Sequence, residues 1–219
     1  MTAGPRGRTV ALAVAAIAAA AAVYAAVWPH ELGHALAAFL LGCREAWWPA
    51  AVTPWLAGSG PGRIDAACLA SRGRLAVAAV ALAGIAMNLL LAAGATALAR
   101  RPHRTGMSLS PLGRTRQVFT LLIALANGAE AVSYLVPNAL WPRADMATAI
   151  ATAGAGRLPW LAAGLILAGA LAWALRAPLR ESAESLASPA LPARFWRWGL
   201  VVYALAVATA ALISRGMYG

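Results

Sequence analysis

Long apolar runs constrain the fold of this chain more than any other feature. Each run is long enough to cross the roughly 30 Å hydrocarbon core of a bilayer as a helix, which takes about 20 residues. Of the 219 residues, 62% are hydrophobic and 11% are charged, whereas soluble domains have about half and about a quarter. Because a segment in lipid must satisfy its backbone hydrogen bonds internally, we expect an all-α integral membrane protein.

The expected spans cover residues 9–42, 75–98, 117–136, 158–175 and 196–213. As one helix the first run would be about 50 Å long, more than a bilayer requires. Pro29 lies within it, and proline removes a backbone donor and clashes with the preceding turn. The run therefore kinks at Pro29 or a second helix begins there, which gives five or six spans in a single domain, residues 1–219.

The first run contains the pattern H-E-x-x-H at residues 30–34. On a helix, His30 and His34 lie one turn apart on one face and can offer two imidazole nitrogens to one metal ion. Glu31 is placed to take a proton from a water that a zinc ion activates. Ionisable groups in a membrane segment are costly and by default mark a function. The pattern therefore predicts a zinc hydrolase with Glu31 as general base.

Two further polar side chains lie inside predicted spans. Asn88 is the one strongly polar residue of its run, so it either holds two helices together by hydrogen bonding or faces the catalytic centre. Glu130 is a lone carboxylate in the third span and must pair, bind a metal or stay neutral.

The charged residues predict the topology. The net charge of +11 comes wholly from arginines, which cluster between the apolar runs and indicate headgroup contacts, with no role in binding nucleic acid. The N-terminus and the loops after Arg100 and Arg176 hold eleven of the 18 arginines. This bias favours a cytoplasmic N-terminus and puts the motif half of the first run and residues 137–145 toward one membrane face.

The connections are expected to be irregular. Residues 43–74, rich in Trp, Pro and Gly, suit the membrane interface and could pair with an extended substrate, although a merely anchored loop is an equal alternative. Arg100 to Arg116 and Arg176 to Arg194 are predicted to form loops. Cys43 and Cys68 support no disulfide framework, and we expect two unpaired cysteines unless their loop faces an oxidising side.

Over roughly residues 10–146 the chain resembles the site-2 protease family, the intramembrane zinc metallopeptidases. Residues 30–38, closing on Gly42, are similar to the family's first signature, and the resemblance implies zinc ligands at His30 and His34 with Glu31 as catalytic acid and base. Ala83-Gly84 followed by Asn88 resembles the second signature, with Ile85 where a proline is usual. For Asn88 the resemblance implies a role in supporting the site or in binding substrate.

The third signature of the family is matched by residues 135–137 and Asp145, although Met146 replaces a glycine and the spacing is longer. Asp145 is the expected third ligand, because a carboxylate oxygen would complete the three-ligand set of a catalytic zinc site. Glu130 is the alternative, either as the ligand itself or as a partner of a ligating histidine.

These observations together predict a zinc metalloendopeptidase that hydrolyses a peptide bond in or near a transmembrane segment of another membrane protein. We expect a multi-pass protein of a bacterial cell membrane, with Zn²⁺ as cofactor and the bilayer and a membrane-protein substrate as partners. The alternative is a non-catalytic membrane protein with a structural or regulatory metal site, or an ion transporter that uses intramembrane His, Glu and Asn.

Overall fold

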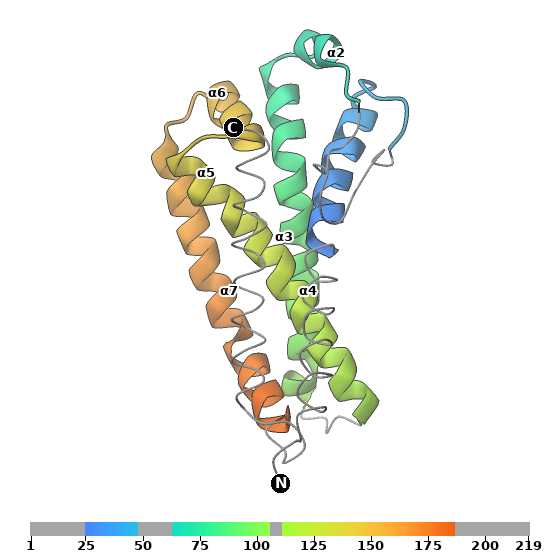
Figure 1. Ribbon diagram of the computed structural model, residues 1–219, viewed down its shortest axis with the longest axis vertical. Helices are drawn as coiled ribbons and strands as arrows, with labels where there is room; N and C mark the ends of the chain where they lie inside the picture. The colour runs from blue at the N-terminus through green and yellow to red at the C-terminus, as the bar shows by residue number, and fades with distance from the viewer. Residues whose placement is uncertain (1–24, 48–62, 106–110, 187–219) are drawn as a thin grey trace, which may run out of the picture.

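The structure is a computed structural model that describes residues 25–47, 63–105 and 111–186. These residues form helices and short connections, with no strand among them. The first helix, here the motif helix, occupies residues 25–40 of the described part. The others are α2 (Ala66–Ser71), α3 (Arg74–Thr105), α4 (Pro111–Leu135), α5 (Pro137–Leu140), α6 (Ala144–Ala153) and α7 (Arg157–Leu186) (Figure 1).

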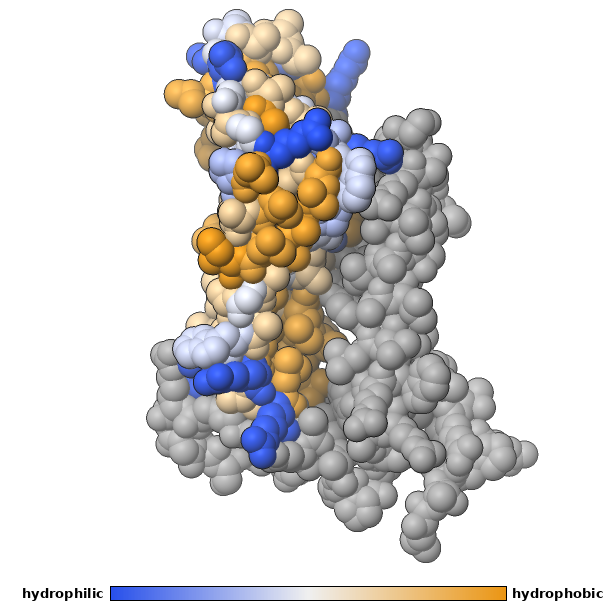
Figure 2. Space-filling model, turned by 90° about the vertical axis from the view of Figure 1, so that its left-hand side faces the viewer, coloured by the Kyte–Doolittle hydropathy of each residue, from blue (hydrophilic) through white to orange (hydrophobic). Residues whose placement is uncertain are grey.

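Three helical segments are long and apolar enough to cross a membrane: Arg74–Arg101, Gln117–Leu140 and Arg157–Arg180. They agree with the second, third and fourth predicted spans, which confirms an all-helical membrane-type architecture for the described residues. Figure 2 shows apolar surface between charged side chains near the two ends of the molecule. The fifth predicted span and the first 24 residues lie outside the described part of the chain.

Helix α3 is central, and it packs against α4, α6 and α7. Helix α4 also packs against α7, and the motif helix lies beside one half of α3 (Figure 1). An apolar cluster built on Ile85, Ala131, Leu135 and Met146 joins α3, α4 and α6. This cluster holds the short helix α6 at the same end of the molecule as the motif helix.

Close contact between the motif helix and α3 depends on a small residue. A Cβ added to Gly33 would collide with the backbone carbonyl of Ala83, so only glycine permits this approach. Small residues at helix interfaces are the usual means of close packing in membranes, where burial from water supplies no driving force. The contact brings the H-E-x-x-H residues directly against α3.

Several expectations about helix ends were wrong. Residues 25–40 form one helix through Pro29, so no second helix begins there, whereas a kink at Pro29 stays a prediction. Arg100 and Arg101 belong to α3, and α7 continues through Pro178 to Leu186, where loops were predicted. Arginine has a high helix propensity, and its long side chain can reach the interface from a helix end, so these runs extend the helices instead of ending them.

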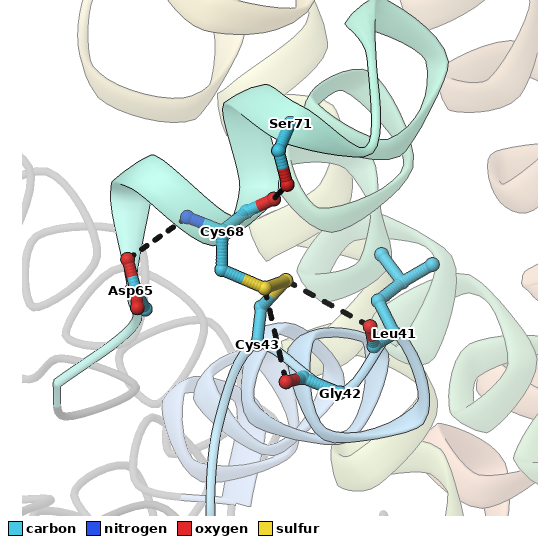
Figure 3. Close-up of a disulfide and its surroundings, with 6 residues drawn as sticks. All are labelled: Leu41, Gly42, Cys43, Asp65, Cys68 and Ser71. Carbon is cyan, nitrogen blue, oxygen red and sulfur yellow. Dashed lines mark hydrogen bonds between the residues drawn. A yellow bond between two sulfur atoms is a disulfide. The ribbon is translucent and has the colours of Figure 1, made fainter.

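The two cysteines form a disulfide, contrary to the expectation of unpaired thiols (Figure 3). Gly42 ends the motif helix with a positive φ of 72°, and the backbone N–H of Asp65 donates to the carbonyl of Cys43. Asp65 also caps α2, accepting from the N–H of Cys68 at 2.9 Å. These turns bring Cys43 and Cys68 to a Cα–Cα distance of 5.4 Å, which their 25-residue separation did not reveal.

Candidate metal centre

Three side chains from two distant parts of the chain meet at the motif helix. Nε2 of His30 and Nε2 of His34 are 3.0 Å apart. A carboxylate oxygen of Asp145, Oδ2, lies 3.4 Å from Nε2 of His30 and 3.2 Å from Nε2 of His34. This group could hold a metal ion, and it contains the two histidines and the aspartate that the sequence suggested.

The distances fit a small tetrahedral ion. Ligand atoms at about 2.0–2.1 Å from a tetrahedral zinc ion lie about 3.3 Å from one another. The three observed separations, 3.0, 3.2 and 3.4 Å, bracket that value. Two imidazoles and a carboxylate also leave a fourth position open, as catalytic zinc sites do.

Space for an ion beside the two imidazoles depends on Gly84 of α3. A Cβ added there would lie 2.5 Å from Nε2 of His34 and 2.7 Å from Nε2 of His30. Any side chain at this position would therefore collide with both ring nitrogens and force the imidazoles apart. The residues present fit the metal, because the donor types and their separations suit zinc and glycine at position 84 lets both imidazoles approach one ion.

The orientation of each imidazole comes from contacts on its other side. Nδ1 of His34 lies 2.6 Å from the carbonyl oxygen of Val80, to which it can only donate. His30 stacks on Tyr134 of α4, with ring centroids 4.3 Å apart, and its Nδ1 lies 3.4 Å from Nδ2 of Asn88. Both rings thus turn Nε2 toward Asp145.

Asp145 is carried by the first turn of α6. Met146 is fully buried in the cluster between α3 and α4, which anchors this turn next to the motif helix. Burial alone would raise the pKa of the Asp145 carboxyl, but hydrogen bonds and charge interactions with the two histidines outweigh it and hold this pKa well below its usual range. The carboxylate is therefore ionised, as a ligand must be.

Glu130, the alternative third ligand, is not in this group. It lies on α4, and its carboxyl is close enough to Glu31 to interact with it electrostatically. Glu31 in turn interacts electrostatically with His34 and is 7% exposed. Glu130 thus interacts with the proposed base through its charge and is not one of the three grouped side chains.

Access to the centre is asymmetric. His30 and His34 are 1% and 4% exposed, whereas the Asp145 side chain is 31% exposed. The open side therefore faces α6, and a pocket lined by Pro137, Asn138, Trp141 and Arg143 lies on the connection that leads to it. Of residues 43–74, which were expected to be irregular, Ala66–Ser71 instead form helix α2, and residues 48–62 lie outside the described part.

Sequence reasoning missed three contributors to this centre: the carbonyl of Val80, the ring of Tyr134 and the lack of a side chain at Gly84. A backbone carbonyl has no sequence signal, and a tyrosine in a span looks like core or interface. The Ala83-Gly84 pair was noticed, but only the structure shows that it faces both histidines.

Comparisons of the chain with protein-family models, with curated proteins and with solved structures find no match.

Proposed function

We propose that this protein is an intramembrane zinc metallopeptidase of the site-2 protease kind, which hydrolyses a peptide bond in or near a membrane segment of another protein. The observation that supports the proposal best is the separation of 3.0–3.4 Å among Nε2 of His30, Nε2 of His34 and Oδ2 of Asp145. The candidate spans and the burial of the histidines also support this proposal.

His30, His34 and Asp145 would hold the zinc ion. When bound, zinc would polarise the scissile carbonyl and lower the pKa of a water molecule to about 7. Glu31 follows His30 directly and is nearly buried, so its carboxylate can take a proton from the attacking water and deliver it to the leaving amine. The low dielectric around these buried groups strengthens each of these interactions.

The substrate must reach the centre as an extended chain. A helix hides its peptide bonds, and unwinding it in lipid costs several kcal/mol for each backbone group left unpaired. The partly exposed Asp145 lies on α6, outside the candidate spans, so water there can satisfy the freed backbone. A segment that already ends near this level would bind with the least unwinding.

The two ends of the molecule differ in a way that supports an orientation. The disulfide lies at the start of α3, and Arg100 and Arg176 flank Trp173 at the other end, 5.5 and 5.2 Å from its ring centroid. Disulfides persist on oxidising sides of membranes, and the arginine bias of the whole sequence favours a cytoplasmic N-terminus. We therefore place the N-terminus in the cytoplasm and the open side of the centre toward the exterior of a bacterial cell membrane.

A cleavage assay in liposomes tests the proposal. The protein would be reconstituted with a library of single-span peptides, and products would be identified by mass spectrometry. We expect zinc-dependent cleavage by the native chain and none by Glu31→Gln, with zinc content unchanged in that variant. Glu45→Gln, which alters an exposed carboxylate, is the matched control and should cleave normally. Equal cleavage by Glu31→Gln, or zinc binding without cleavage of any library member, would contradict the proposed activity.

A further inference from the structure

We propose that Asn88 is a positioning residue for the metal centre: its amide oxygen accepts a hydrogen bond from Nδ1–H of His30 and so leaves Nε2 free to bind zinc. The inference rests on the proposed function, because it concerns how one ligand of that centre is prepared. It goes further by giving the amide a defined partner and a defined direction of hydrogen bonding.

Asn88 lies on the side of α3 that meets the histidines. Its side chain is fully buried, and it lies one helical turn after Gly84 on α3, so both residues face the histidines. Its Nδ2 atom lies 3.4 Å from Nδ1 of His30. Within the described residues its Oδ1 atom is buried without a hydrogen-bond partner.

Zinc binding through Nε2 of His30 determines which ring nitrogen carries the proton. A neutral imidazole carries one proton, and a nitrogen that binds a metal must offer its lone pair. If Nε2 binds the ion, Nδ1 carries the proton and requires an acceptor. An amide nitrogen at Nδ1 would place two donors face to face, and Nε2 would have to hold the proton instead.

A rotated Asn88 amide removes this conflict between two facing donors. The oxygen and nitrogen of an asparagine amide have nearly the same shape, and their assignment follows from the hydrogen-bond network. Turning the amide by half a rotation puts Oδ1 at Nδ1 of His30. Both histidines then donate from Nδ1 to a carbonyl oxygen, because the carbonyl of Val80 already accepts from Nδ1 of His34 at 2.6 Å. Metal-binding histidines almost always donate their other N–H to such an acceptor.

A measurement of zinc affinity distinguishes the positioning of His30 by Asn88 from a role of Asn88 in substrate binding. Asn88→Leu removes the acceptor, and loss of such a partner typically weakens metal binding about 10- to 100-fold. Asn88→Asp supplies a carboxylate oxygen at the same place and should restore the affinity to within a few-fold of the native chain. Zinc dissociation constants would be measured by competition with a chromophoric chelator, on protein whose metal-free thermal midpoint shows that it is folded.

A control on the same helix removes a comparable buried polar group elsewhere. Thr96 is buried, and its hydroxyl has no partner in the described part of the chain, so Thr96→Val should leave zinc affinity unchanged. Native affinity in Asn88→Leu would overturn the inference, and so would a loss in Asn88→Asp as large as that in Asn88→Leu. If the native chain binds no zinc, the proposed function itself fails, which is a different outcome.

Discussion

Substitution of Gly84 by alanine should weaken zinc binding strongly while leaving the fold intact. The new methyl group would lie 2.5 and 2.7 Å from the two ligating nitrogens, whereas carbon and nitrogen in ordinary contact are about 3.5 Å apart. The rings must therefore retreat by about 1 Å, or the ion must lose at least one ligand. Neither arrangement preserves the 3.0–3.4 Å triangle of ligand atoms.

The expected magnitude follows from the contribution of one ligand. Four-ligand zinc sites bind with about 10–16 kcal/mol, or about 2.5–4 kcal/mol for each ligand. At 1.4 kcal/mol per tenfold, Gly84→Ala should weaken zinc binding by about two to three powers of ten. Crowding of the helix contact should cost about 1–3 kcal/mol of stability in addition.

Gly94→Ala is the matched control for this experiment. Gly94 lies on the same helix, and an added Cβ there meets nothing within 4 Å. This variant should bind zinc normally and be equally stable or slightly more stable, since alanine favours helices by about 1 kcal/mol over glycine. Zinc titration of both variants in detergent provides the assay. Native affinity in Gly84→Ala would refute the placement of the ion beside Gly84.

Three further predictions concern the ligands and the disulfide. Removal of zinc by a chelator should lower the thermal midpoint of the native chain but not that of His30→Ala, since saturation at 100 times the dissociation constant stabilises by about 2.7 kcal/mol; equal shifts would argue against binding through His30. Asp145→Asn should lose zinc in elemental analysis, whereas Glu130→Gln should retain it, and the reverse result would exchange their roles. Polymer-linked maleimide should add mass to Cys43 and Cys68 only after reduction, and labelling without reductant would contradict the disulfide.

The spans and the chemistry-bearing residues could be predicted because their signals are local. Apolar runs of sufficient length identify helices in lipid, and H-E-x-x-H places two imidazoles on one helical face. The preference for Asp145 over Glu130 came from a resemblance and from ligand chemistry. In the structure Asp145 lies beside the two histidines, across 115 residues of sequence from His30.

The remaining features depend on contacts that no local pattern encodes. The pairing of Cys43 with Cys68 follows from the turn at Gly42 and the cap of α2, and neither was predicted. The acceptor for His34 is a backbone carbonyl 46 residues away, which any residue type could supply. Helix ends were misplaced because Arg100, Arg176 and Pro29 were taken as boundaries. Packing against neighbouring helices carries α3 and α7 further.

The most direct test of the metal centre is the zinc X-ray absorption spectrum of the purified, detergent-solubilised protein. We expect one zinc per chain, with nitrogen and oxygen neighbours at about 2.0–2.2 Å and the multiple-scattering pattern of two imidazoles. In Asp145→Asn the zinc signal should fall to background at the same added metal concentration. A spectrum with sulfur neighbours at about 2.3 Å, or an unchanged spectrum in His30→Ala, would contradict the centre.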